Sequence, residues 1–304
     1  MIIAEIGQNH NGSMSLAKKL IIEAKQNGAD IVKFQLFNAK RLFKKKNNQW
    51  YNYNCKTELN YQQVKYLNRL CQKNKIEFMA SAFDEERVKW LQEIKVKKIK
   101  IASRSINDKA LIKNILETKI PTIISLGKWK KKSLPKLKGN ILGYLYCISD
   151  YPTELKKIKF KKNDFVKKYL GFSDHTIGLT AAKISISLGA KIIEKHFTIS
   201  KGMVGPDHLA SLNPKELISM VKAIRSTEII LGKNNKIVSN SEKKNISIAR
   251  KSLFASRDIK KGEKFSLNNL ACLRPGFGIS PMDIDKVCKL KAKQFFLKGQ
   301  MIKI

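Results

Sequence analysis

The stretch YLGFSDHTIGLTAAKISISLGAKIIEKHF, residues 169–197, decides the fold. It has a short apolar run at 169–172, an amphipathic segment at 179–188 and a second apolar run at 191–197. This is the pattern of a strand, a crossover helix and a parallel strand. Each apolar run leads to a histidine, His175 or His196. Because such strands end at the same edge of a sheet, we expect the two imidazoles to lie together.

The same alternation extends through the first 231 residues. Strands are predicted at 2–6, 30–36, 77–81, 98–102, 121–126, 141–146, 169–172 and 191–197. Helices are predicted at 16–27, 61–73, 84–93, 108–118, 179–188 and 214–231. Eight strands in a βα series predict an α/β fold, a closed (β/α)8 TIM barrel, with its chemistry on the loops at the C-terminal strand ends.

One crossover differs from the others. The segment between the fifth and sixth strands, residues 128–139, is basic and contains Pro135, which interrupts helices. We therefore expect an abbreviated fifth crossover, a loop or a single turn.

The pattern changes again after residue 231. Residues 232–245 are rich in Asn, Ser and Lys and poor in apolar periodicity, which indicates a linker. Residues 246–304 contain short strands and tight turns, which predict a small β-rich domain that depends on a neighbour. The predicted organisation is a barrel at 1–231, a linker at 232–245 and a second domain at 246–304.

The formal charge of +37 raises the question of nucleic-acid binding. Only eight of the 61 basic residues are arginine, the side chain best suited to bidentate phosphate and base recognition. Lysines also run through almost every polar helix face. We expect no specific nucleic-acid partner, and a positive field that attracts anionic substrates.

Cysteine usage and hydropathy predict a soluble protein with reduced cysteines. The five cysteines are odd in number and widely spaced, which is untypical of a disulfide framework or a zinc knuckle. The N-terminus lacks the pattern of a signal peptide. No apolar run approaches the roughly 18 residues that cross a bilayer. We expect a cytoplasmic protein without a membrane partner.

Each predicted strand brings a polar side chain to one rim of the barrel. The residues are Glu5, Lys33, Gln35, Ser81, Lys100, Ser103, Ser125, Ser149, Tyr151, Ser173, His175, Glu194 and His196.

These rim residues allow more than one interpretation. His175 and His196 could converge on one metal ion with positions left for water and substrate, or simply form hydrogen bonds at the rim. Lys33 and Lys100 are placed for a phosphate or carboxylate, yet lysines at strand ends also extend to solvent. The serines either cap turns or supply neutral donors to an anion.

Several ordered motifs resemble the sialic acid (N-acetylneuraminate or nonulosonic acid) synthase family. They are AEIGQNHNGS at 4–13, VKFQ at 32–35, KIAS at 100–103, YPT at 151–153, SDHT at 173–176, EKHFT at 194–198 and GPDH at 205–208. Towards the C-terminus, DIKKGE at 258–263 and RPGFG at 274–278 are similar to the family's SAF (antifreeze-like, β-clip) domain. The resemblance covers essentially the whole chain.

The resemblance implies an enzyme that condenses phosphoenolpyruvate with the open-chain aldehyde of an N-acetylated amino sugar. It implies that His175 and His196 hold a divalent ion, usually manganese with magnesium or cobalt as alternatives, which polarises the aldehyde and delivers water. Glu5 would accept a proton at that centre. Phosphate and carboxylate would be bound by Lys33, Lys100, Ser81, Ser103, Ser149 and Ser173, with Gln35 in support.

The family also implies how the sugar is recognised. Tyr151, Glu194 and Asp207 would contact it, and Arg274 would reach its N-acetyl group from the SAF domain of a partner subunit. A domain-swapped homodimer is therefore expected.

Departures from the family pattern concern the substrate. Arg104-Ser105 stands where an acidic residue commonly follows the Lys-Ile-x-Ser motif, and Leu126 replaces a threonine. The acceptor could thus be another hexose derivative, including 2,4-diamino precursors of nonulosonic acids. Two alternatives stay open, a phosphoenolpyruvate-dependent synthase acting on a different, phosphorylated aldose and a catalytically silent carbohydrate-binding protein.

Overall fold

The structure is a computed structural model that describes residues 1–46, 48–232 and 237–304. The chain divides into two compact units, residues 1–232 and residues 233–304.

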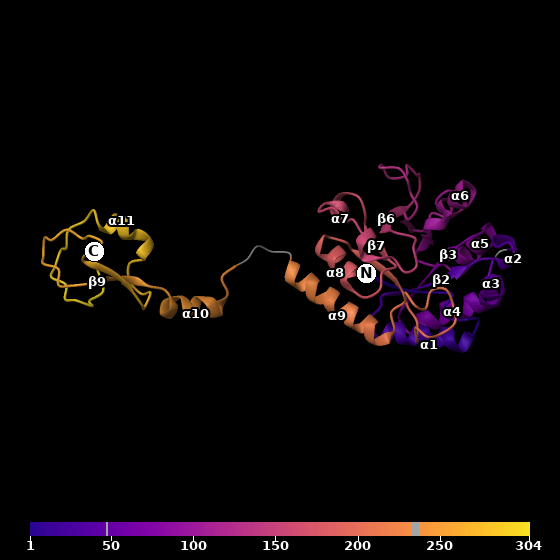
Figure 1. The fold of residues 1–304 in the computed structure, drawn as a ribbon, viewed down its shortest axis with the longest axis horizontal. Coiled ribbons are helices and arrows are strands. Elements are labelled where there is room, and N and C mark those ends of the chain that lie inside the picture. The colour runs from indigo at the N-terminus through magenta and orange to yellow at the C-terminus, as the bar shows by residue number, and fades with distance from the viewer. Residues whose placement is uncertain (47, 233–236) are drawn as a thin grey trace. The chain divides into compact units, whose positions relative to one another are not determined.

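The first unit is built around eight parallel strands that close into a barrel (Figure 1). The order around the barrel is the order along the chain, so the predicted TIM barrel is confirmed. The strands are β1 Ile2–Gly7, β2 Ile31–Leu36, β3 Glu77–Ala82, β4 Ile99–Ile101, β5 Thr122–Ser125, β6 Ile141–Cys147, β7 Gly171–Asp174 and β8 Ile192–His196.

Helices join most of the strands and cover the outside of the barrel. They are α1 Met14–Gln26, α2 Ala39–Leu42, α3 Tyr51–Thr57, α4 Tyr61–Lys73, α5 Glu85–Glu93, α6 Lys109–Glu117, α7 Asp164–Lys167, α8 Thr180–Ser187 and α9 Pro214–Leu231. Helices α4 and α9 have the predicted bounds. Their first residues are fixed by capping boxes, formed by Asn60 with Gln63 and by Asn213 with Glu216. The short helices α2 and α3 were not predicted, since neither is long enough to show a helical period.

Alternation along the strands divides the barrel interior into two layers. Inward-facing apolar side chains form a core at the N-terminal side: Ile3, Ile31, Met79, Ile123, Leu145 and Ile192. Two residues further along the same strands stand polar side chains, Glu5, Lys33, Ser81, Ser125, Cys147 and Glu194. Since successive side chains alternate across a strand, a spacing of two brings both layers to the same side. The apolar layer therefore forms the floor beneath a polar site.

The fifth crossover is abbreviated, as predicted. Among the described residues, none between β5 and β6 is helical. The segment is held instead by Trp129, whose indole donates to the Ser133 carbonyl at 2.8 Å, and by Tyr144, whose hydroxyl donates to the Pro135 carbonyl at 2.8 Å. Leu134 and Leu137 pack against the barrel core. The sixth crossover also contains little helix, only a 3-10 turn at Leu155–Lys157 and the short helix α7.

The predicted linker at 232–245 contains the start of a helix that was not predicted. Helix α10, Asn240–Ala249, begins inside it. Ser239 accepts from the Glu242 backbone N–H while the Glu242 carboxylate accepts from the Ser239 backbone N–H, and this capping box starts a helix without an apolar stripe. Residues 233–236 of the predicted linker lie outside the described part of the chain.

The second unit has its own small core. Strands β9 Ser252–Ala255 and β10 Leu270–Leu273 pair antiparallel, and a 3-10 turn at Pro281–Asp283 leads into α11 Ile284–Val287. The buried side chains include Leu253, Ile259, Phe265, Phe296 and Ile302. The unit is thus a compact β-rich domain, as its short strands and tight turns predicted.

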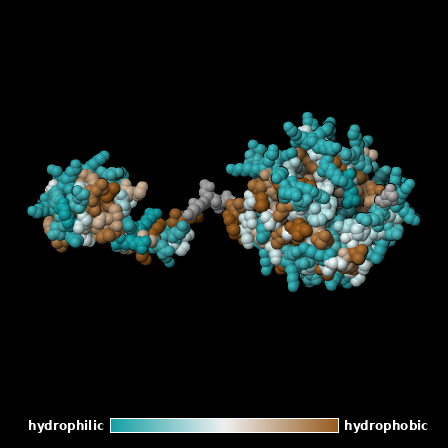
Figure 2. Space-filling model, in the orientation of Figure 1, coloured by the Kyte–Doolittle hydropathy of each residue, from teal (hydrophilic) through white to brown (hydrophobic). Residues whose placement is uncertain are grey.

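Much of the barrel surface visible in Figure 2 is hydrophilic, as expected for lysines on outer helix faces. Within the described residues, no helix has the length and apolar character needed to span a bilayer.

Candidate active site

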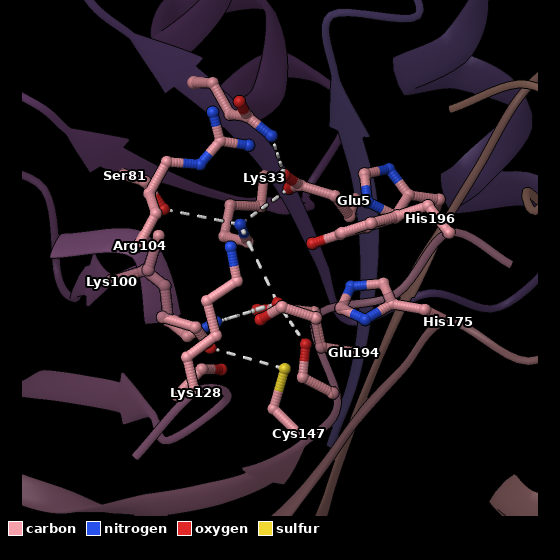
Figure 3. A pocket seen from close by; sticks show the side chains of 17 residues that line it. Glu5, Lys33, Ser81, Lys100, Arg104, Lys128, Cys147, His175, Glu194 and His196 are labelled. Carbon is pink, nitrogen blue, oxygen red and sulfur yellow. Dashed lines mark hydrogen bonds and ion pairs between the residues drawn. The ribbon is translucent and has the colours of Figure 1, made fainter. Parts of the chain in front are cut away.

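The C-terminal strand ends enclose a pocket of about 150 Å³. Figure 3 shows its side chains converging from different strands. Its lining comprises Glu5, Lys33, Gln35, Ser81, Lys100, Ala102, Ser103, Arg104, Ser125, Lys128, Cys147, Ser149, Tyr151, Ser173, His175, Glu194 and His196. Every barrel residue predicted for the site lies here except Asp207.

Strand register explains why these residues meet. Glu5 is level with Lys33 on one side and with His196 on the other. Ser81 is level with Gln35 and Lys100, and Ser173 with Glu194. Since residues level with each other on parallel strands point to the same side, barrel closure brings them into one ring.

The deepest part of the pocket is a network of buried charges. Lys33 Nζ lies 2.9 Å from Glu5 Oε2 and 3.8 Å from Glu194 Oε1. Lys100 Nζ donates to both oxygens of Glu194 at 2.7 and 2.8 Å. Ser173 Oγ donates to Glu194 at 3.0 Å, and Gln35 Nε2 donates to Glu5 at 2.9 Å. Each carboxylate is therefore fixed by a cation and a neutral donor.

The protonation of this network follows from its pairing. Burial alone would raise the pKa of Glu194, but Lys100, Lys33 and the hydrogen bonds from Lys100 and Ser173 lower it to about 2. Burial alone would lower the pKa of Lys33, yet Glu194 and Glu5 raise it above its usual value. The carboxylate and the ammonium are both charged at neutral pH.

The two histidines stand beside this network. Their ring centroids lie 5.6 Å apart, and the ring of Tyr151 lies 4.2 Å from that of His175. His175 Nδ1 lies 2.8 Å from the Ile148 carbonyl oxygen, so this nitrogen carries the proton and Nε2 keeps its lone pair. Burial, with the neighbouring His196, lowers the pKa of His175 to about 3. His175 is a neutral imidazole with a free acceptor nitrogen.

This donor set fits a divalent metal ion. Metal-ligating histidines typically donate their other ring N–H to a carbonyl, as His175 does. His196 Nδ1 is buried, has no hydrogen-bond partner in the described part of the chain, and lies 3.9 Å from Asp207 Oδ2. Among the described residues no group of three or more His, Cys, Asp or Glu side chains is arranged for a metal, so further ligands would come from water and substrate.

The histidines are positioned from behind by a second buried ion pair. Asp174 and Lys195 directly precede them in the chain and face away from the pocket. Lys195 Nζ lies 2.8 Å from Asp174 Oδ2 and donates to the Thr176 carbonyl at 2.5 Å, while Asp174 Oδ1 accepts from the Thr176 N–H at 2.8 Å. This pair joins β7 to β8 where both histidines emerge.

Two predicted site residues lie outside the pocket lining. Asp207 is next to it, near His196. Arg274 belongs to the second unit, where it is exposed.

Sequence reasoning missed other lining residues. Cys147 could have been found, because it follows the inward-facing Leu145 by two residues, as Ser125 follows Ile123. Arg104 was noted only as a departure from a family pattern. Lys128 follows a turn outside any periodic segment, so no sequence signal indicated that it lines the pocket.

Comparison with known proteins identifies the family. The model of the NeuB family matches residues 20–236, more than half of the chain. The chain belongs to the NeuB family. The SAF domain model matches residues 250–304. The predicted membership of the sialic acid synthase family and the predicted SAF domain are thus confirmed.

Individual relatives match over most of their length. The N,N'-diacetyllegionaminic acid synthase of Campylobacter jejuni is 37% identical over 100% of this chain and 98% of that protein. The enzyme of the same name from Legionella pneumophila is 36% identical over 94% and 88%. The solved structure of the N-acetylneuraminic acid synthetase from Leptospira borgpetersenii, in complex with citrate, has a TM-score of 0.71 and 30% identity, covering 81% of this chain and 89% of its own.

Proposed function

We propose that the chain condenses phosphoenolpyruvate with the open-chain aldehyde of an N-acetylated amino sugar. C3 of phosphoenolpyruvate forms a bond to the aldehyde carbon, C2 takes an oxygen from water, and the bond between C2 and the phosphate oxygen breaks. One water proton ends on the new hydroxyl and the other on the phosphate. The products are a nine-carbon 2-keto acid and inorganic phosphate.

The observation that carries this proposal is the ring of paired charges beside two histidines. Lys33 and Lys100 supply cations to a small anion, and the hydroxyls of Ser81, Ser103, Ser149 and Ser173 line the same pocket. Ser149 Oγ is buried without a hydrogen-bond partner from any described residue, which suits a ligand oxygen. Since the lysines already neutralise two carboxylates, the anion must replace or share those contacts.

Glu5 is our candidate for the proton acceptor at C2. It is only 3% exposed, and Gln35 and Lys33 hold its two oxygens in place. Its strand position, level with His196, puts it beside the histidines. A carboxylate fixed in this way can take a proton from water without rearranging.

The residues that meet the sugar lie toward the pocket mouth. Tyr151 is 43% exposed and packs on His175, and Asp207 lies near His196. Glu194 was expected to contact the sugar, but its carboxylate is engaged by Lys100 and Ser173. We therefore assign Glu194 first to positioning Lys100.

His175 and His196 are the residues that would hold a divalent ion, with manganese as our first choice and magnesium or cobalt as alternatives. When bound, such an ion acts as a Lewis acid on the aldehyde carbonyl. Treatment with a chelator should abolish turnover and manganese should restore it. The His175→Ala variant should bind manganese more weakly by calorimetry, and unchanged binding would contradict the assignment.

We further propose that the acceptor is a diacetamido hexose and that the enzyme works as a homodimer. The first point is supported by the two N,N'-diacetyllegionaminic acid synthases. The second is supported by the exposed turn that carries Arg274, where Phe277 is 69% exposed although apolar. In this arrangement Arg274 reaches the N-acetyl group of a sugar in the partner subunit.

One experiment tests the activity and the acceptor together. The protein is incubated with phosphoenolpyruvate, manganese and a panel of N-acetylated and phosphorylated amino sugars, and phosphate release and product mass are measured. We expect release with a 2,4-diacetamido hexose. Product from a phosphorylated sugar alone would establish the alternative acceptor, and no product from any sugar, while a characterised relative works in parallel, would refute the synthase proposal.

A further inference from the structure

The side chains that line the pocket carry more positive than negative charge. Four cations line it, Lys33, Lys100, Arg104 and Lys128, against the carboxylates of Glu5 and Glu194. The first two lysines have carboxylate partners within 3 Å. Within residues 1–46, 48–232 and 237–304, the structure gives the side chains of Arg104 and Lys128 neither an ion pair nor a hydrogen bond. The uncompensated charge therefore belongs to these two residues.

Neighbouring strand ends hold these two cations at one side of the pocket. Arg104 lies in the 3-10 turn Ser103–Ser105 after β4, with its guanidinium carbon 5.4 Å from the centre of the Phe83 ring. Lys128 follows β5, and its side chain points into the pocket in Figure 3. The charge of Arg104 also acts on Lys33, because it lowers the pKa of Lys33 against the stronger effect of the carboxylates.

The backbone between them is closely fitted. The Gly127 N–H donates to Ser103 Oγ at 2.9 Å, which ties the turn after β5 to the turn after β4. A Cβ on Gly127 would overlap the Ser149 hydroxyl and lie 2.8 Å from Ser103 Oγ. Lys128 has a positive φ of 63°, which turns the chain directly after this contact. The bases of both cationic side chains are thus coupled through Ser103 and Gly127.

Hydroxyl groups without partners lie at the same side. Ser125 Oγ and Ser149 Oγ are buried and have no hydrogen-bond partner among the residues that the structure describes. A buried hydroxyl without a partner is costly, so both are satisfied only when a ligand or water supplies an acceptor. Two unneutralised cations above two unsatisfied donors match a phosphate group, which presents several acceptor oxygens and about two negative charges.

We propose that Arg104 and Lys128 clamp the phosphate group of phosphoenolpyruvate over the hydroxyls of Ser125 and Ser149. The inference rests on the proposed function for the identity of the anion. The guanidinium offers a planar fork to two phosphate oxygens, and the lysine adds a point charge. The paired cations Lys33 and Lys100 are then left to the carboxylate end of the same ligand.

The test measures binding of phosphoenolpyruvate without an acceptor, by calorimetry, in the full-length protein. The variants are Arg104→Met, Lys128→Met and the double variant. Lys132→Met is the matched control, because it removes one charge from the same crossover loop at an exposed position outside the pocket. Inorganic phosphate serves as a second probe. Circular dichroism and melting temperature establish that each variant is folded.

Each single substitution should weaken the binding of phosphoenolpyruvate and of phosphate by about tenfold. This loss is in the lower range for a charge-assisted hydrogen bond, because both side chains are exposed. The control should bind as the wild type does. The KM for the acceptor, at saturating phosphoenolpyruvate, should not change. Arg104→Lys should recover only part of the affinity, because a lysine cannot make the bidentate contact.

Three outcomes would overturn the clamp. The first is a variant that binds phosphoenolpyruvate within twofold of the wild type, and the second is an equal loss of affinity in Lys132→Met. The third is a rise in the KM for the acceptor alone, which would assign both cations to an acidic group on the acceptor. Failure of the proposed function looks different, since a wild type that binds phosphoenolpyruvate without converting any sugar leaves the binding comparison intact.

Discussion

Replacing Lys195 by methionine tests whether the buried ion pair behind the histidines stabilises the barrel. The side chains of Lys195 and Asp174 are 1% and 0% exposed, so the substitution leaves a carboxylate buried without its cation. Breaking a buried pair in this way costs about 3–5 kcal/mol of the free energy of unfolding. The Thr176 carbonyl also loses its donor.

A second substitution separates the pair from its surroundings. In the double variant Asp174→Leu/Lys195→Met neither charge is buried, so most of the loss should be recovered. Replacing Asp174 also removes the acceptor of the Thr176 N–H, which leaves a cost of about 1–3 kcal/mol in the double variant. The double variant should therefore be more stable than Lys195→Met alone.

The assay is urea denaturation followed by circular dichroism, with Arg225→Met as the control. Arg225 pairs with Asp30 at 3.1 Å, but both side chains are more than 40% exposed, so its loss should cost less than about 1 kcal/mol. If Lys195→Met costs no more than Arg225→Met, the buried pair does not stabilise the fold and the reasoning is refuted.

Three further outcomes are expected. Burial lowers the pKa of His10 to about 4 in the folded protein. As the pH falls, the unfolded chain therefore takes up a proton on His10 before the folded protein does. The free energy of unfolding should fall by about 3 kcal/mol between pH 6.5 and 4. His10→Leu should remove this part of the pH dependence, and an unchanged slope would contradict it. Gly127→Ala should raise the KM for phosphoenolpyruvate by about tenfold through displacement of Ser103 and Ser149. Gly202→Ala, whose Cβ would lie 3.9 Å from Ser200 Oγ, should leave this KM unchanged. Glu5→Gln should lower kcat by about 100-fold or more while phosphoenolpyruvate still binds, and a kcat near wild type would exclude Glu5 as proton acceptor.

The order of strands and the side of each rim residue could be predicted from the sequence. Both depend on local patterns: apolar runs, helical periods, and alternation along a strand. Lys33 and Lys100 were predicted on the rim because each stands where an apolar run ends, and the motifs around His175 and His196 indicated the family.

The helix α10 was missed for a local reason too, since its capping box lies in a polar segment without an apolar stripe. The abbreviated fifth crossover was predicted from Pro135 and the basic composition, but the position of Lys128 in the pocket was not. A turn residue has no periodicity that tells where its side chain points.

The sequence by itself determined a barrel, its rim of polar residues and a pair of histidines. Only the tertiary structure decided which charges meet, because Lys100 and Glu194 are 94 residues apart and their contact depends on barrel closure. Closure pairs Lys33 and Lys100 with carboxylates. Among the described residues, Arg104 and Lys128 have no carboxylate partner. The electrostatics of the site therefore follow from strand register and closure, which no local segment encodes.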